Sequence, residues 1–309
     1  MDIVIENLTK RYGNQKAVDN ISMKVATGEI LGFLGPNGAG KTTTMKMITN
    51  FIAADEGEIY IGGKSLKDDP YELKKHIGYL PENNPLYHEM PVIDYLDFIA
   101  RIQGIEKSRI PARIIEMIQL TGLNKEKHKK IGELSKGYQQ RVGLAQTMIH
   151  NPEILILDEP TTGLDPNQIA EIRKLIRELG REKTVILSTH ILPEVEATCD
   201  RILIINKGKL VADGTAETLR KQAQGTDILK VKIEDGDPNQ VFKSLQSLHS
   251  IAVVEFADRL LNKFDIHCKP GMDAKRDIFK LCVEKNWVLT EMTPFETKLE
   301  DIFRELTMN

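Results

Sequence analysis

The segment Gly35–Thr42 constrains the fold of this chain more than any other part. Its sequence is G-P-N-G-A-G-K-T, and it lies between the apolar run Glu29–Leu34 and the helix-forming stretch Lys41–Phe51. A glycine-rich loop between a strand and a helix lets backbone N–H groups approach and cradle phosphates. The sequence therefore predicts an α/β fold with a phosphate-binding loop, and a plain glycine turn is the alternative.

The side chains at the end of this loop fit a nucleoside triphosphate with magnesium. We expect the Lys41 ammonium to reach the β- and γ-phosphates and the Thr42 hydroxyl to bind Mg²⁺. The other residues that we expect to contact the nucleotide from the loop and the start of the helix are Gly35, Pro36, Asn37, Gly38, Ala39, Gly40 and Thr43. ATP and Mg²⁺ are therefore the predicted cofactors.

A second buried strand brings two carboxylates to the same region. Ile154–Leu157 is entirely apolar and is followed by Asp158 and Glu159. In a parallel sheet the ligand crevice lies at the carboxyl ends of the strands. We expect Asp158 to hold magnesium, directly or through water, and Glu159 to orient or deprotonate the attacking water. Without the phosphate-binding loop upstream, such an acid pair could equally be structural.

The spacing of apolar residues indicates three parts within the region around the loop. Ile3–Asn7 and Ile21–Val25 alternate as half-buried strands do, which predicts an antiparallel β subdomain. Pro166–Gly180 predicts a helix and Val185–Ser188 a buried strand, so we expect a mostly parallel central sheet. At about residues 83–150, apolar residues recur at helical spacing, which predicts a helical subdomain inserted between the two β–α units.

A change of pattern divides the chain into two domains. The polar connector Ala216–Gln224 is followed by Gly225, where we place the boundary between a nucleotide-binding domain at residues 1–222 and an accessory domain at residues 226–309. Strand and helix patterns then follow in the order βαββαβα, which predicts a small α+β domain of ferredoxin-like fold. These segments are 228–233, 238–248, 251–256, 261–268, 273–284, 287–292 and 298–306.

Composition limits the possible partners. A formal net charge of -3 over 309 residues provides no cationic field, so we do not expect nucleic acid as a partner. Cys199, Cys268 and Cys282 are far apart, with no C-x-x-C pair, and predict neither a zinc site nor a disulfide framework. No signal peptide and no apolar run long enough to span a bilayer is evident. We expect a chain that stays outside the bilayer, without a covalent membrane anchor.

Further motifs carry a resemblance to a family. Leu134–Arg141, with the sequence L-S-K-G-Y-Q-Q-R, resembles the signature motif of ABC ATPases and begins 20 positions before the acidic strand. Gly163–Asp165 resembles the D-loop of that family, His190 its switch histidine and Tyr12 its aromatic A-loop residue. All these parts occur in the family's order, and the resemblance covers residues 2 to about 220.

The resemblance implies that two copies of the chain close head to tail around ATP. Ser135 and Gly137 of one copy would then face the γ-phosphate that Lys41 of the other copy holds, with Asp165 nearby. A hydroxyl and an uncrowded N–H at a helix start favour an anion physically. The alternatives are an ordinary helix cap for Ser135, a satisfied strand-end histidine for His190, and packing beside the turn instead of adenine stacking for Tyr12.

Two departures from the family pattern affect the expected site. Glu82, in the segment G-Y-L-P-E, stands where the family usually has a glutamine that senses magnesium and the attacking water. A carboxylate there would still bind magnesium, but with a charge, so we expect Glu82 to act both as a metal ligand and in catalysis. Lys136 and Tyr138 replace the first signature glycine and the usual glutamine, which leaves Ser135 and Gly137 as the residues carried over.

Finer resemblances suggest the biological role. Lys298–Leu306 looks like the carboxyl end of exporter ATPases of the ABC-2 class, and the whole chain is similar to ATPase subunits linked to bacterial gliding motility. This implies a peripheral ATPase at the cytoplasmic face of the cell membrane that drives a separate integral-membrane permease. Pro85–Pro91 is the expected docking segment for that permease, although its apolar residues could simply pack the helical subdomain.

Two other hypotheses remain in view. The first is a soluble ABC-type ATPase that acts on nucleic acid or ribosomes. The single phosphate-binding loop and the lack of sustained heptads disfavour this alternative, because such proteins typically carry two nucleotide domains or long coiled coils. The second concerns the accessory domain, which could brace the dimer or sense a ligand that regulates the ATPase.

Overall fold

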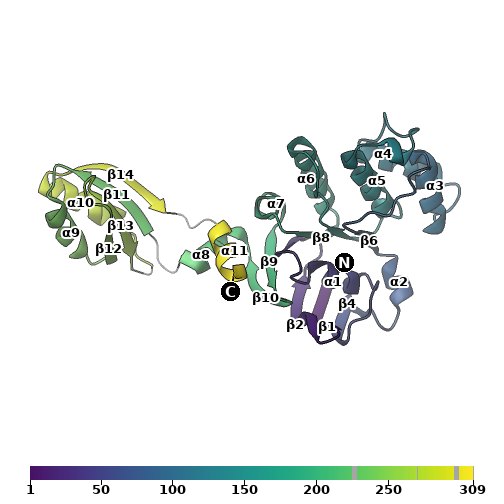
Figure 1. Ribbon diagram of the computed structural model, residues 1–309, viewed down its shortest axis with the longest axis horizontal. Helices are drawn as coiled ribbons and strands as arrows, with labels where there is room; N and C mark the ends of the chain where they lie inside the picture. The colour runs from purple at the N-terminus through teal and green to yellow at the C-terminus, as the bar shows by residue number, and fades with distance from the viewer. Residues whose placement is uncertain (225–227, 270, 296–298, 309) are drawn as a thin grey trace. The chain divides into compact units, whose positions relative to one another are not determined.

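The computed structural model describes residues 1–224, 228–269, 271–295 and 299–308, apart from some side chains near the gaps. The chain forms two compact units: Met1–Ala216 together with the residues from Leu306 onward, and Glu217–Glu305. Gly225, where the sequence places the domain boundary, and Lys298 of the carboxyl-terminal motif lie outside the described residues. Figure 1 shows the helices and strands of both units.

A six-stranded sheet forms the centre of the first unit, with the strand order β10-β9-β3-β8-β7-β6. Five strands run parallel, and β10 (Lys209–Gly214) pairs antiparallel to β9 at one edge. The parallel strands are β3 (Ile30–Leu34), β6 (Ile77–Leu80), β7 (Ile154–Asp158), β8 (Thr184–Thr189) and β9 (Arg201–Asn206). Every residue of β3, β7 and β8 is buried, as in parallel strands covered on both faces. The predicted α/β sheet is confirmed.

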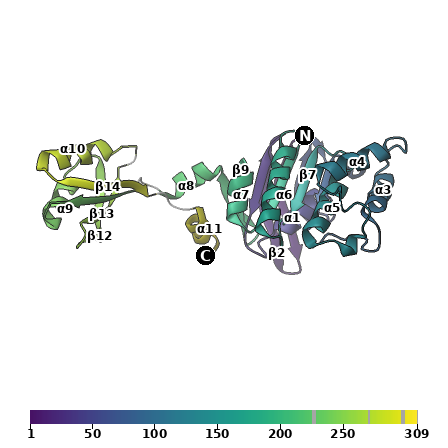
Figure 2. The ribbon, with the colours of Figure 1, turned by 90° about the horizontal axis from the view of Figure 1, so that it is seen from above.

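Alternate residues of these strands point into two different cores. Leu155 and Leu157 pack on the side of α6 (Pro166–Gly180), where α6 also lies against α7 (Leu192–Thr198). Ile154 and Ile156 pack on the opposite side, toward α1 (Lys41–Ile48). Figure 2 shows α6 and α7 next to each other on the first unit. The nucleotide loop and the acidic strand end therefore lie between two packed layers.

A smaller antiparallel sheet covers α1, with the order β2-β1-β4-β5. Its strands are β1 (Ile3–Tyr12), β2 (Gln15–Val25), β4 (Glu56–Ile61) and β5 (Lys64–Ser65). β1 and β2 form a hairpin around Gly13 and extend further toward this turn than the apolar residues alone predict. Helix α1 ends at Ile48 and not at Phe51, because Asn50 takes the left-handed conformation, with a φ of 49°, and stops the helix.

The helical subdomain packs against the β6 edge of the central sheet. It consists of α3 (Val92–Ile102), α4 (Ile110–Leu120), a short 3₁₀ turn (Ile131–Glu133) and α5 (Lys136–Met148). Leu96, Ile114 and Val142 form its core, and the Tyr95 hydroxyl donates to the Gln146 side chain. Burial raises the pKa of Tyr95 to about 12. Helix α5 begins at Lys136, three residues before the apolar pattern, because polar signature residues occupy its first turn.

The second unit contains a four-stranded antiparallel sheet with the order β12-β13-β11-β14. Its elements follow one another as a βαββαβ series, which is the arrangement of a ferredoxin-like fold. They are β11 (Ile228–Glu234), α9 (Pro238–Gln246), β12 (Ile251–Asp258), β13 (Lys263–Cys268), α10 (Lys275–Lys285) and β14 (Val288–Phe295). Helices α8 (Ala216–Gln224) and α11 (Leu299–Met308) flank this series in the sequence. Strand β14 begins one residue after Trp287, whose buried ring belongs to the core of this unit.

The remaining short helix, α2 (Pro70–Lys74), precedes β6. In the part of the chain that the structure describes, no helix is both long enough and apolar enough to cross a bilayer.

All three cysteines are free thiols, and Cys268 and Cys282 are buried in the second unit.

Candidate functional site

At two positions of the loop between β3 and α1, only glycine fits against the backbone behind the loop. Gly40 has a φ of 111°, and a Cβ there would come within 2.4 Å of the Ala17 carbonyl oxygen. A Cβ at Gly35 would come within 2.4 Å of the Ile205 carbonyl oxygen. Gly38 has a φ of 79° but faces open space. The loop is thus held tightly from behind, with its free side unobstructed for an anion.

A cleft of about 370 Å³ opens beside this loop. It is formed by the loop, the start of α1 and the residues that follow the ends of β6, β7 and β8. The lining residues are Ala17, Asn37, Gly38, Gly40, Lys41, Thr42, Thr43, Glu82, Glu159, Thr162 and His190. Most of the side chains predicted to contact nucleotide, magnesium or the attacking water are therefore gathered in one cavity, as the parallel sheet requires.

Lys41 is buried at the base of the loop. Its ammonium donates hydrogen bonds to the carbonyl oxygens of Gly35, at 2.7 Å, and Pro36, at 3.2 Å. It also lies 3.4 Å from Glu159 Oε1, and each of these two side chains is only 6% exposed. A buried ion pair is stable only when its charges are close and its remaining polar atoms are hydrogen-bonded. Lys41 meets the second condition through the two carbonyl oxygens, and Glu159 meets it through its other oxygen.

Glu159 contacts His190 through its other oxygen. Glu159 Oε2 is 2.9 Å from His190 Nδ1 and accepts a hydrogen bond from the Thr162 hydroxyl at 3.3 Å. The backbone of Glu159 has a φ of 49°, and its N–H donates to the Ser188 carbonyl oxygen at 3.0 Å. A left-handed residue outside glycine is unfavourable and persists where its surroundings fix it, frequently at functional sites.

Asp158 is fully buried next to Glu159. The Ser188 hydroxyl donates to Asp158 Oδ1, whereas Oδ2 has no hydrogen-bond partner among the described residues. Burial raises the pKa of Asp158 above its usual range, and hydrogen bonds from Ser188 and the neighbouring Thr42 oppose this shift. An unpaired carboxylate oxygen in a buried position is costly unless a cation or donor reaches it.

These residues fit a magnesium ion that is shared with phosphates. Asp158 Oδ2, the Thr42 hydroxyl and the Glu82 carboxylate are oxygen donors of the kind that Mg²⁺ prefers. No group of three or more His, Cys, Asp or Glu side chains within the described ranges could hold a metal by itself. Mg²⁺ typically completes its octahedron with phosphate oxygens and water, so this donor set suits it.

Ser135, Gly137 and Asp165 do not line the cleft of the same chain, and of the three only Ser135 and Asp165 are exposed, so the uncrowded N–H expected at Gly137 is wrong for the single chain. Ser135 stands at the N-cap position of α5, exposed, and its hydroxyl makes no capping bond. Gly137 is pressed against Gln168, since a Cβ would come within 2.5 Å of that side chain. Asp165 caps α6 by accepting hydrogen bonds from the N–H groups of Asn167 and Gln168, both at 3.0 Å. The signature and D-loop segments therefore lie against each other.

The other predicted nucleotide contacts lie outside the lining of the cleft. Gly35, Pro36 and Ala39 form the inner side of the loop, where Ala39 is buried. Tyr12 ends β1 with its ring 53% exposed and with Lys10 Nζ 5.9 Å from the ring centroid. Adenine stacking by Tyr12 stays a prediction.

Three residues of the site were missed from the sequence, and one of them, Ala17, lines the cleft from β2. Thr162 lines the cleft and donates to Glu159. Ser188, on β8, hydrogen-bonds to Asp158 and to the N–H of Glu159. The feature that could have identified it in the sequence is a hydroxyl directly after the apolar segment Val185–Leu187. Such a residue in a fully buried strand needs a polar partner, and a carboxylate at the end of the neighbouring strand is the nearest candidate.

Comparisons with known proteins agree with this geometry. Residues 18–162 match the family model described as ABC transporter. An ABC transporter ATP-binding protein of Bacillus subtilis is 36% identical over 308 residues, covering 98% of this chain and 95% of the relative. The bacitracin transport ATP-binding protein of Bacillus licheniformis is 36% identical, covering 97% and 95%. The linearmycin resistance ATP-binding protein of Bacillus subtilis is 33% identical, covering 98% and 97%.

Solved structures share the architecture of the first unit. A structure described as the ATP binding subunit of an ABC transporter has a TM-score of 0.66 and 29% identity, covering 72% of this chain and 93% of its own. The cbiO1 subunit from Clostridium perfringens, part of an ABC transporter complex, has a TM-score of 0.65 and 29% identity, covering 72% and 92%. Together with the cleft, these likenesses show that the chain belongs to the ATP-binding, ATP-hydrolysing subunits of ABC transporters.

Proposed function

We propose that this ATPase is the motor subunit of an ABC-2 type exporter, in which two copies close head to tail around ATP and drive a separate integral-membrane permease from the cytoplasmic face of the membrane. The observation that carries the catalytic part is the position of Glu159 between Lys41 and His190. The names of two relatives, for bacitracin transport and linearmycin resistance, support an export role. The resemblance of the carboxyl end supports the ABC-2 class.

The residues of the cleft divide the work of hydrolysis. Lys41 and the loop backbone would hold the β- and γ-phosphates, while Asp158, Thr42 and Glu82 would hold Mg²⁺. When bound, Mg²⁺ neutralises charge on the phosphate oxygens. Glu159 accepts the proton of the attacking water.

His190 supports that role of Glu159. Because the Glu159 carboxylate is an acceptor, the Nδ1 atom of His190 donates to it, and the ring holds the carboxylate in one orientation. His190 is 41% exposed at the cleft, so its other nitrogen remains available to the γ-phosphate. We therefore assign Glu159 as the general base and His190 as the residue that orients it and contacts the nucleotide.

The second half of each nucleotide site comes from the partner copy. The Ser135 hydroxyl is exposed and makes no capping bond, so it is free to meet a phosphate. Its place at the start of a 13-residue helix adds the attraction of the helix terminus for an anion. Ser135 and Asp165 are exposed and would close over the cleft of the partner, whereas Gly137 is buried behind Ser135, against the Gln168 side chain, and supports this surface.

A mixing experiment tests the head-to-tail arrangement. Lys41→Ala and Ser135→Arg chains are each expected to lack ATPase activity. In their heterodimer, the Lys41 of one chain meets the Ser135 of the other, so one of the two sites is intact and activity should return on mixing. A mixture that forms heterodimers but stays inactive would contradict this arrangement. Mixing two differently tagged Lys41→Ala chains provides the control, because neither site is then complete.

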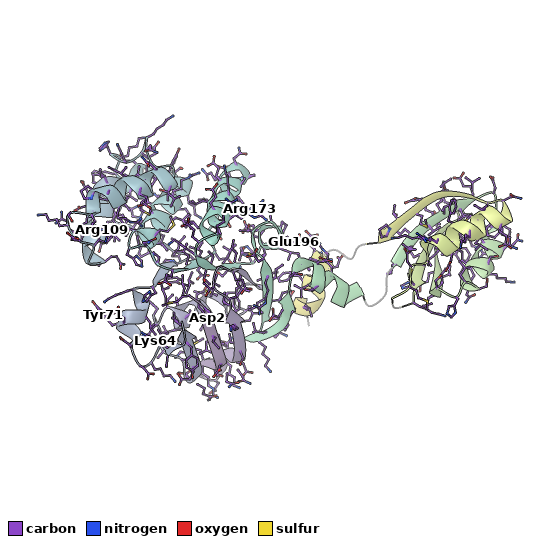
Figure 3. All side chains as sticks on the ribbon, turned by 180° about the vertical axis from the view of Figure 1, so that it is seen from behind. Asp2, Lys64, Tyr71, Arg109, Arg173 and Glu196 are labelled. Atoms are coloured by element: carbon purple, nitrogen blue, oxygen red, sulfur yellow. The ribbon has the colours of Figure 1, made fainter. Side chains whose placement is uncertain are left out.

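A groove beside the helical subdomain supports docking of a permease. One cavity of about 230 Å³ is lined by Phe51, Tyr79 and His150, and an adjoining one of about 530 Å³ includes Arg109. Phe51 is 72% exposed. Figure 3 shows Arg109 and, on the nearby α2, Tyr71, which is 77% exposed, on the same side of the first unit. We propose this groove as the permease contact.

The segment Pro85–Pro91 packs the helical subdomain, and its predicted role in docking stays a proposal. Leu86 is buried in the core of the helical subdomain, and the Tyr87 ring packs on those of Tyr95 and Phe98. Tyr87 is nevertheless 55% exposed and can also meet a partner. Purification of the intact membrane complex, followed by Phe51→Asp and Tyr87→Asp variants, tests the contact. Loss of the permease only with Phe51→Asp would restrict docking to the groove.

The link to gliding motility rests on sequence resemblance alone. Disruption of the gene in its source organism tests it, and gliding that continues unchanged would remove this part of the proposal. The competing role, an ATPase acting on nucleic acid or ribosomes, predicts that the chain is recovered with DNA or ribosomes and not with a membrane protein.

The second unit is proposed to brace the dimer. Phe279 and Val283 lie one turn apart on α10 and are 56% and 60% exposed, so they offer an apolar contact to another chain. Deletion of the residues after about 225 should then weaken dimerisation. If the deletion leaves the dimer intact but changes the ATPase rate, and a small molecule binds the full chain, this unit is a regulator.

A further inference from the structure

Glu194 is a buried carboxylate that the mechanism described above does not use. It lies on α7, is 4% exposed, and forms no salt bridge with a residue that the structure describes. Its Oε1 atom has no hydrogen-bond partner in the described part of the chain. Burying a carboxylate without a cation is costly, so its contacts should explain why it is there.

Both contacts of Glu194 are to segments that carry the reacting side chains. The Thr161 hydroxyl donates to Glu194 Oε2 at 2.7 Å, and the Thr189 hydroxyl donates to the same oxygen at 3.1 Å. Thr161 follows Glu159 by two residues, and Thr189 directly precedes His190. Thr161 is 3% exposed and Thr189 is fully buried, so both hydrogen bonds are shielded from water.

Backbone hydrogen bonds connect Thr161 and Thr189 to the segments that carry Glu159 and His190. The N–H of Thr162 donates to the Glu159 carbonyl oxygen at 3.2 Å, so Thr161 lies inside the tight turn that begins at Glu159. On the other side, the Thr189 hydroxyl accepts from the N–H of Ile191 at 3.1 Å and so spans His190. Glu194 therefore joins the two segments at a second point, separate from the direct contact between Glu159 and His190.

We infer that Glu194 is a positioning residue for ATP hydrolysis, because its carboxylate ties the turn after Glu159 to the segment that carries His190 and fixes how these two side chains meet. The inference deepens the proposed function and rests on the roles given there to Glu159 and His190. Glu159 has a left-handed backbone with a φ of 49°, which needs such support from its surroundings. Misplacement by about 1 Å at a reacting group can cost on the order of 100-fold in rate.

Three substitutions separate positioning from folding. Glu194→Leu removes the acceptor and introduces an apolar side chain of similar size, so kcat should fall about 10- to 100-fold. The ATP dissociation constant should change by less than about twofold, because the phosphate contacts stay in place. Glu194→Gln retains an acceptor for the two hydroxyls and should keep kcat within about threefold of the wild-type value. Thr161→Val removes one of the two donors and should give an intermediate kcat.

The matched control is Thr198→Val. Thr198 lies on the same helix, is 2% exposed, and its hydroxyl has no partner in the described structure. This variant makes the same Thr-to-Val change in a buried position without touching Glu159 or His190, so kcat should stay at the wild-type value. Each rate is measured well below the unfolding midpoint of that variant, so that a loss of stability does not lower the rate.

The outcomes distinguish this inference from the proposed function. If Glu194→Leu keeps kcat within twofold, if Glu194→Gln loses as much as Glu194→Leu, or if Thr198→Val loses as much as Thr161→Val, the positioning role is wrong. If Glu159→Gln retains the wild-type rate, the assigned base is wrong, and the proposed function fails whatever Glu194 does. Loss of activity in Glu159→Gln together with full activity in Glu194→Leu would overturn only the inference about Glu194.

Discussion

The side chains of Glu159 and His190 meet with 2.9 Å between Oε2 and Nδ1, although 31 positions separate them in the sequence. The contact exists because β7 and β8 are parallel neighbours in register, so that the residue after each strand end projects into the same crevice. The other oxygen of Glu159 lies 3.4 Å from Lys41 Nζ. One carboxylate is thus fixed from both sides, by the phosphate-binding lysine and by the histidine.

Glu159→Gln should separate nucleotide binding from hydrolysis. Glutamine has nearly the same shape but cannot accept the proton of the attacking water, so kcat should fall roughly 100- to 10,000-fold. ATP should still bind, because Lys41 and the loop are unchanged, and the dimer should become longer-lived in ATP. Steady-state ATPase assays and nucleotide titrations measure the two effects. Glu178→Gln, an exposed change on α6, is the control, and near-normal hydrolysis by Glu159→Gln would contradict the assignment.

Gly40→Ala should destabilise the protein more than the same change at Gly28. Both glycines have positive φ values, 111° and 78°. At Gly28 no atom lies within 4 Å of the added Cβ, whereas at Gly40 the Ala17 carbonyl oxygen would be only 2.4 Å away. The backbone conformation alone should cost about 1–2 kcal/mol at Gly28, and Gly40→Ala adds the clash. Urea unfolding compares the two, and equal losses would show that the loop can move away from Ala17.

Much of the central sheet could be predicted from the sequence, because runs of apolar residues indicate strands that are buried on both faces. The runs Ile154–Leu157 and Val185–Ser188 lie within fully buried strands, and the motif residues mark where those strands end. Short polar elements gave no such signal. β5 has two residues and α2 has five, and they form because the surrounding sheet and loops fix them.

The contacts that hold the site together were less predictable. The Ser188 hydroxyl hydrogen-bonds to Asp158 and to the N–H of Glu159, and Glu194 accepts hydrogen bonds from two threonine hydroxyls. Those pairings depend on which strands and helices become neighbours. The periodicity of a sequence does not encode such pairings. The end of α1 illustrates a local effect of the same kind, since Asn50 stops the helix although the apolar pattern continues to Phe51.

His150 should make stability depend on pH. Burial lowers the pKa of His150 below its usual value of 6.5, although its Nε2 donates to the Ile77 carbonyl oxygen, and Lys183 and Arg113 oppose protonation as well. A lowered folded-state pKa means that the unfolded chain binds the proton more readily, so stability is lost as the pH falls below 6.5. Urea unfolding between pH 7.5 and 5 should show a steeper loss for the wild type than for His150→Gln. Parallel curves would exclude this effect.

Asp158→Asn should raise the melting temperature of the protein in the absence of Mg²⁺ and lower it, relative to the wild type, when Mg²⁺ and ATP are present. Burial raises the pKa of Asp158, which means that the folded protein resists ionisation of this carboxyl as the pH rises above 3.8. In EDTA at neutral pH, the wild type should therefore melt at a lower temperature than Asp158→Asn, in which the neutral amide can still accept from Ser188.

Adding Mg²⁺ with ATP should reverse the order for Asp158→Asn, because only the wild type supplies a charged oxygen at the position where Oδ2 has no partner within the described residues. The affinity for ATP in EDTA should be similar for both proteins, whereas the gain in affinity on adding Mg²⁺ should be much smaller for the variant. Thermal melts and nucleotide titrations in the two buffers measure these differences. An equal gain in both proteins would mean that Thr42 and Glu82, and not Asp158, hold the metal.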